Sequence, residues 1–175
     1  FNGKIYVFGG LTSQGYGMNQ VLCFDPVTDS WDSMANMPTP RSASSVIIKD
    51  GRIWVIGGWN GASMANVESY DPLSNTWRSE PSMTMGRPWA TSWTAGNNVY
   101  VAGGNGPQTN SIELFSDDSQ QWNQVSTLPM TLAPASATLE GKVYIVGGES
   151  SNGYFSNKVF AADLPAPAIN LYFKD

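Results

Sequence analysis

Histidine is missing from this 175-residue sequence, and cysteine occurs only once, at Cys23. Without histidine, the chain lacks the commonest general base and the commonest metal ligand of proteins. Catalysis by a Ser/His/Asp or Cys/His arrangement is therefore excluded. A single cysteine also excludes an intrachain disulfide, and its position in an apolar strand predicts a buried, inert thiol.

Charged residues are scarce as well, at 13 % of the sequence, and only nine of them are lysine or arginine. The net charge of −5 and a pI near 4.5 argue against nucleic-acid and anionic-membrane partners, which need a basic surface. No run approaches the roughly 18 apolar residues of a membrane-spanning helix. By contrast, 41 % apolar residues, 18 glycines and 11 prolines favour a turn-rich all-β domain.

A pair of adjacent glycines ends a short apolar run four times along the chain. The pairs are Gly9-Gly10, Gly57-Gly58, Gly103-Gly104 and Gly147-Gly148, so the periods are 48, 46 and 44 residues. Each pair closes one template, spelled KIYVFGG, RIWVIGG, NVYVAGG and KVYIVGG. A recurrence of this length predicts one structural unit per repeat.

Other markers keep the same register inside the repeats. Tryptophans stand at positions 31, 77 and 122, each preceded by an aromatic residue at Phe24, Tyr70 or Phe115. Turn sequences such as Asp50-Gly51 come before the glycine-ended runs and predict hairpins. A complete repeat is therefore predicted to form four antiparallel strands, which is typical of a β-propeller blade.

The predicted fold is an all-β propeller of four-stranded blades with about four repeat units, the first and last incomplete. The predicted repeats span roughly 1–34, 35–80, 81–126 and 127–164, and 165–175 is a tail or closing strand. This division holds fourteen strands, and the run AINLYFKD at 168–175 is a candidate for one more.

The double glycine, the following aromatic residue and the later tryptophan resemble the kelch family of β-propellers, over nearly the whole chain. The resemblance implies that neighbouring blades crowd the glycines and that the aromatic side chains pack between blades. Closed kelch rings hold more blades than this chain supplies. We therefore expect either part of a longer propeller or chains that self-associate through open blade edges.

The same resemblance implies that two sets of loops share one face of the propeller. The loops between second and third strands are 11–20, 59–66, 105–111 and 149–158, and the loops between blades are 32–41, 78–87 and 123–132. Their amide and hydroxyl groups and isolated aromatics suit a binding surface. The predicted ligand-binding residues are Arg41, Arg87, Trp59, Asn60, Tyr16, Asn105, Tyr154 and Phe155.

Arg41 and Arg87 share a register, each ten residues after a repeat tryptophan, whereas Leu132 holds the third copy. Two roles are open to these arginines. They can grip a ligand carboxylate in bidentate fashion, or they can pin a loop between blades by bonding its carbonyl groups.

Glu68 and Glu113 also share a register, on third strands of different blades. A pair of carboxylates can hydrolyse a glycosidic bond, but their separation favours structural ion pairs. The galactose-oxidase type of kelch enzyme needs copper bound by histidines, so it is excluded, and neither a metal nor another cofactor is predicted. A sialic-acid mutarotase is the enzymatic alternative, with Arg41 or Arg87 holding the sugar carboxylate.

The leading functional prediction is a non-catalytic scaffold that binds a protein or peptide segment through the loop face, as the propellers of ubiquitin-ligase adaptors do. The alternative is a glycan-binding module of a secreted bacterial propeller, which the Trp-, Tyr- and Asn-rich loops favour. Neither nucleic acid nor a membrane is expected as a partner.

Overall fold

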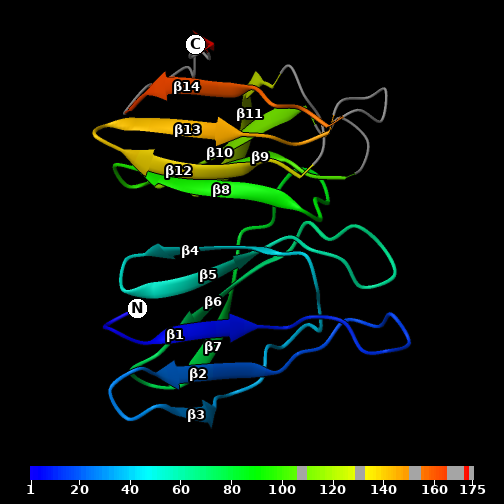
Figure 1. Cartoon of the computed structure of the whole chain (residues 1–175), viewed down its shortest axis with the longest axis vertical. Coiled ribbons are helices and arrows are strands. Elements are labelled where there is room, and N and C mark those ends of the chain that lie inside the picture. Colours follow the sequence, from blue (N-terminus) through cyan, green and yellow to red (C-terminus); the bar gives the residue numbers. More distant parts are fainter. Residues whose placement is uncertain (106–109, 129–132, 150–154, 165–171, 174–175) are drawn as a thin grey trace.

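The computed structural model describes residues 1–105, 110–128, 133–149, 155–164 and 172–173. These residues form four antiparallel sheets that follow one another along the long axis of the molecule (Figure 1). The described residues contain no helix long and apolar enough to cross a membrane. The all-β class predicted from the repeats is confirmed.

We call the four sheets blades 1 to 4. Blade 1 contains β1 (Ile5–Phe8), β2 (Val21–Asp25) and β3 (Ser30–Ser33). Blade 2 contains β4 (Ser45–Lys49), β5 (Arg52–Ile56), β6 (Val67–Asp71) and β7 (Thr76–Glu80). Blade 3 contains β8 (Ala90–Ala95), β9 (Asn98–Gly103), β10 (Ser111–Ser116) and β11 (Gln121–Thr127). Blade 4 contains β12 (Ala135–Leu139), β13 (Lys142–Val146), β14 (Val159–Asp163) and β15 (Tyr172–Phe173).

Each strand pairs with its neighbours in the sequence, so every blade is a meander. β15 pairs with β14 and completes blade 4 as its fourth strand, in the run that was a candidate for an added strand. Tight turns join first to second strands, as Asp50 and Gly51 do with φ values of 50° and 71°. Positive φ at both central residues suits the twist of a two-residue hairpin.

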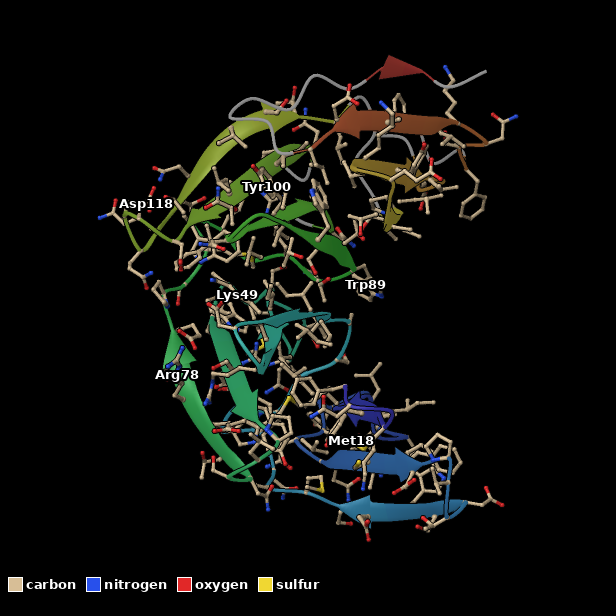
Figure 2. All side chains as sticks on the ribbon, turned by 90° about the vertical axis from the view of Figure 1, so that its left-hand side faces the viewer. Met18, Lys49, Arg78, Trp89, Tyr100 and Asp118 are labelled. Carbon is tan, nitrogen blue, oxygen red and sulfur yellow. The ribbon has the colours of Figure 1, made fainter. Side chains whose placement is uncertain are left out.

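The blades are arranged in an open arc, seen along its axis in Figure 2. The first strands contact one another in series, β4 with β8 and β8 with β12. Apolar cores lie between neighbouring blades: Val55 packs with Val21 of blade 1, and Trp54 packs with Phe115 of blade 3. Because packing of this kind depends on both partners, each blade is held by its neighbours.

The glycine pairs lie where the next blade approaches most closely. A Cβ atom added at Gly57 would lie 2.7 Å from the Arg87 carbonyl oxygen of blade 3, and one at Gly9 only 2.1 Å from that of Arg41 in blade 2. At Gly147, in the last blade, the nearest described atom would be 3.8 Å away. Crowding by the next blade therefore explains the glycine that ends the second strand of blades 1 and 2.

The repeat tryptophans pack toward the preceding blade. Trp77 donates a 2.8 Å hydrogen bond from Nε1 to the carbonyl of Ala35, and its ring meets Phe8 edge-on. Trp122 donates in the same way to the carbonyl of Pro81. Trp31 differs, with 55 % of its surface exposed, because no described blade lies in front of blade 1.

Candidate functional site

The loops that follow second strands and the loops between blades emerge at the same end of the sheets (Figure 1). We define the loop face as residues 11–20, 38–44, 59–66, 84–89 and 105. Main-chain bonds join its loops across blades: Arg41 N–H donates to the carbonyl of Met18 at 2.9 Å, and Arg87 N–H to that of Met64 at 3.0 Å. The loops therefore form one connected surface.

Arg41 lies beneath this surface and is fully buried. Its Nη1 donates to the carbonyls of Gly57 and Asn66 at 2.9 and 3.0 Å, and its Nη2 lies 2.8 Å from Oε2 of Glu68. The guanidinium group thus ties the end of β5 to the start of β6 within blade 2.

Arg87 repeats this arrangement in blade 3 and is also fully buried. Its Nη1 donates to the carbonyls of Gly103 and Ser111 at 3.1 and 2.9 Å, and its Nε to Oε1 of Glu113 at 3.0 Å. The other carboxylate oxygen of Glu113 accepts bonds from N–H and Oγ1 of Thr84, both at 2.7 Å. The ion pairs expected for the two glutamates are present.

Burial lowers the pKa of both guanidinium groups, and the paired carboxylates of Glu68 and Glu113 oppose that shift. Of the two roles left open for Arg41 and Arg87, the geometry supports the structural one. Neither side chain reaches solvent, and each is bonded to main-chain carbonyls and a carboxylate, so neither is available to grip an external ligand. Leu132, which stands ten residues after Trp122 in the sequence, lies outside the described residues.

Tyr16 and Trp59 have different exposures on the loop face. Tyr16 is 69 % exposed, at the tip of a loop closed by a 2.8 Å bond from Thr12 N–H to the carbonyl of Tyr16. Trp59 is half-buried, and its backbone exchanges hydrogen bonds with Ser42. The next residue, Asn60, is exposed, and its Oδ1 accepts a 3.2 Å bond from the N–H of Gly17 in blade 1.

The other predicted residues are spread along the arc. Asn105 is exposed over blade 3, where its N–H donates to the carbonyl of Pro88 at 2.8 Å. Phe155 is 88 % exposed over blade 4 and forms an isolated bridge with Glu149. Tyr154 lies outside the described residues. The structure therefore places Trp59 beside Ser42, in the loop between blades 1 and 2, and Asn60 beside Gly17 of blade 1. Phe155 lies apart from them, over blade 4.

Trp89 was missed by the sequence analysis. It is 46 % exposed, it has a φ of 56°, and its N–H donates to the carbonyl of Ala43 at 2.8 Å. Positive φ is unusual for so bulky a residue. Figure 2 places Trp89 on the concave side of the arc. One feature of the sequence could have indicated it. The equivalent positions of blades 2 and 4 are occupied by alanine, Ala43 and Ala133, which also have positive φ, whereas blade 3 has a tryptophan there.

The loop face, as defined over blades 1 to 3, has little charge. Arg41 and Arg87 are its only charged residues at neutral pH, and both are buried in ion pairs. Within the described part of the chain, no cluster of acidic or cysteine side chains is arranged to hold a metal ion. The face can therefore recognise a ligand through aromatic contacts and neutral hydrogen bonds.

A family model described as the KLHDC2/KLHL20/DRC7 Kelch-repeats domain matches residues 1–104, more than half of the sequence. The chain belongs to the kelch-repeat family. This kelch-repeat chain is 30 % identical to Kelch-like protein 35 of Mus musculus over 173 residues, which are 93 % of the chain and 29 % of that protein. It is 28 % identical to Beta-scruin of Limulus polyphemus over 164 residues, covering 85 % of the chain and 18 % of the relative.

The fold of this kelch-repeat chain is shared with a solved structure, that of YjhT. The two superpose with a TM-score of 0.77 at 20 % sequence identity, covering 98 % of this chain and 63 % of YjhT. The kelch β-propeller architecture expected from the repeats is therefore confirmed. The chain spans less than a third of the two curated relatives named above.

Proposed function

We propose that this kelch-repeat chain is a non-catalytic scaffold that binds a segment of a protein partner through the loop face. The observation that carries the proposal is the combination on that face of exposed aromatic side chains, Tyr16 and Trp89, with neutral amides and no accessible charge. Aromatic anchors and depletion of charge characterise the buried centres of protein interfaces.

The support beneath the loop face favours the same function. The buried guanidinium groups of Arg41 and Arg87 hold the ends of strands, and main-chain bonds join loops from different blades. A surface held in this way loses little conformational entropy when it binds. The membership of Kelch-like protein 35 and of this chain in one family agrees with a recognition role.

The acidic and basic side chains considered for catalysis are poorly placed for it in the described residues. Glu68 and Glu113 are buried, belong to different blades and are paired with arginines. A general acid or base must reach the reacting group directly or through one water. The mutarotase-like alternative also loses its carboxylate grip, because neither Arg41 nor Arg87 is exposed.

A glycan is the second candidate ligand, and the same exposed rings and amides favour it. Asn60 and Asn105 are exposed near the half-buried Trp59 and near Pro88, respectively. Amides and aromatic rings can both contact an uncharged sugar. The experiment below therefore includes a neutral glycan array.

The test selects phage-displayed random peptides on the wild-type chain and measures selected peptides on two variants. One variant combines Tyr16→Ala with Trp89→Ala on the loop face. The matched control combines Val27→Ala with Leu73→Ala, which are 91 % and 86 % exposed in turns at the opposite end of the sheets. Loss of the aromatic anchors is expected to weaken peptide binding at least about tenfold, whereas the control keeps it.

The proposal fails if no peptide is enriched, or if selected peptides bind the loop-face variant as tightly as the wild type. Binding to neutral glycans that disappears in the Tyr16→Ala/Trp89→Ala variant, without any peptide binding, would assign the face to glycans instead. Circular dichroism of both variants checks that the blades remain folded.

A further inference from the structure

Trp89 on the loop face has features that the fold itself does not require. Its side chain is 46 % exposed, and its backbone has a φ of 56°. The equivalent positions of blades 2 and 4 carry Ala43 and Ala133, also at positive φ, so alanine suffices for this turn. Left-handed backbone is costly for a bulky residue, and such strain concentrates at functional sites. The exposed indole is therefore the feature that the tryptophan adds to blade 3.

Asn105 lies beside the turn that carries Trp89. Its N–H donates to the carbonyl of Pro88, the residue before Trp89, at 2.8 Å. Its own carbonyl accepts a 3.4 Å bond from Oγ of Ser63 in blade 2. Asn105 is exposed, and its side-chain amide has no hydrogen-bond partner among the described residues. These bonds hold a free amide next to the turn with the exposed indole, in a blade that has a described blade on each side.

The loop face suits some modes of segment recognition better than others. Domains bind internal segments of a partner by strand addition, by holding a helix in an apolar groove, by capturing an acidic motif with arginines, or by docking a polyproline II helix. Strand addition needs a free strand edge, whereas the loop face consists of loops beyond the strand ends. Capture of an acidic motif is excluded because Arg41 and Arg87 are buried in ion pairs.

A helix in a groove needs a continuous row of apolar contacts. The large apolar side chains exposed on the loop face are Leu11 and Tyr16 in blade 1 and Trp89 in blade 3. Between them lies the loop 59–66 of blade 2, whose exposed residues are small or polar. Isolated rings among neutral polar groups suit the remaining mode, because a polyproline II helix rests its prolines on aromatic rings and has carbonyls free of internal hydrogen bonds.

We propose that the loop face binds a polyproline II segment of a partner protein and that Trp89 is the residue that selects proline. The indole offers a flat apolar face to a proline ring, and the amide of Asn105 donates to a carbonyl of the segment. The segment is uncharged where it crosses blades 1 to 3, since a buried charge there would have no accessible counter-charge. This inference rests on the proposed function and adds the chemistry of the bound segment.

The experiment selects two phage-displayed peptide libraries of equal length and size on the 175-residue chain. One library fixes prolines in a central PxxP pattern, and the other fixes alanines in the same places as AxxA. Peptides are expected to be enriched from the proline library alone. Fluorescein-labelled copies are then titrated by anisotropy, and replacing one fixed proline by alanine is expected to weaken binding about tenfold.

Variants of the chain test the two side chains. Trp89→Ala is expected to weaken binding of a selected peptide at least about tenfold, and Trp89→Phe, which keeps an aromatic face, by less. Asn105→Ala removes one hydrogen bond and is expected to cost about three- to tenfold. Because alanine occupies the equivalent turns, Trp89→Ala should keep its fold, checked by circular dichroism. The matched control, Leu73→Ala, changes a side chain that is 86 % exposed in a distant turn and should bind normally.

Equal enrichment of the two libraries would overturn the inference, and so would equal affinity of selected peptides for Trp89→Ala and the wild type. In both cases the proposed function would stand, because peptides still bind. Enrichment from neither library would also overturn the inference, and the random peptide library described above then decides whether the loop face binds any protein segment.

Discussion

Substituting alanine for Gly57 tests whether crowding between blades is the reason for the recurring glycine pair. The matched control is Gly51→Ala in the same blade. Both glycines have left-handed backbone, with φ values of 63° and 71°, so the conformational cost of about 1–2 kcal/mol is shared. They differ in their surroundings: no described atom lies within 4 Å of a Cβ added at Gly51.

At Gly57 the added Cβ would lie 2.7 Å from the carbonyl oxygen of Arg87 and 2.9 Å from Cε of Met83. The same carbonyl accepts a 3.1 Å bond from the N–H of Gly58, so moving it costs a hydrogen bond, about 1 kcal/mol. Overpacking adds about 1–3 kcal/mol. Gly57→Ala is therefore expected to lower the free energy of unfolding by about 2–4 kcal/mol more than Gly51→Ala.

The assay is urea unfolding followed by tryptophan fluorescence, with the slope of free energy against urea compared among wild type and variants. If Gly57→Ala and Gly51→Ala differ by less than about 1 kcal/mol at equal slopes, crowding by blade 3 is not what requires the glycine.

Three further predictions concern the buried ion pair of Arg87 and Glu113, the repeat tryptophans, and the raised pKa of Tyr6. Glu113→Gln leaves a buried guanidinium charge uncompensated and is expected to cost about 3–5 kcal/mol in urea unfolding, whereas Lys142→Met, in a pair with Asp163 whose side chain is 73 % exposed, should cost less than about 1 kcal/mol. Trp77→Ala should destabilise the chain by about 3 kcal/mol, and Trp31→Ala by less than half of that, since Trp31 is 55 % exposed; equal losses would contradict the packing described. Burial, assisted by a hydrogen bond with Cys23, raises the pKa of Tyr6 from 10.0 to about 12. Its contribution to stability is thus complete below pH 10.0 and is lost as the pH rises toward about 12, so Tyr6→Phe should flatten the alkaline fall in stability.

The repeat architecture could be predicted from the sequence because its determinants are local and recur. A glycine pair, an aromatic residue and a tryptophan in register predict the same strands and turns wherever they occur. The last repeat, in which the aromatic and tryptophan markers are missing, was less predictable. The fourth strand of blade 4, β15, pairs at only two positions with β14, and no tryptophan marks it.

The candidate site was only partly predictable, because exposure depends on neighbours that are distant in sequence. Arg41 and Arg87 are polar residues in predicted loops, which made a ligand role reasonable, yet residues 16 to 26 positions later enclose them. Trp89 carries no periodic signal, and its exposure follows from the backbone turn at positive φ that the bond to Ala43 holds.

By itself, the sequence determined the all-β class, the four units, the glycine and tryptophan positions and the absence of histidine chemistry, since each depends on residue type and spacing. The tertiary structure decided which polar residues are buried and which aromatic residues reach solvent. Burial is a property of how blades pack together. The same residue type can therefore be enclosed at one position and exposed at another, as Trp54 and Trp89 are.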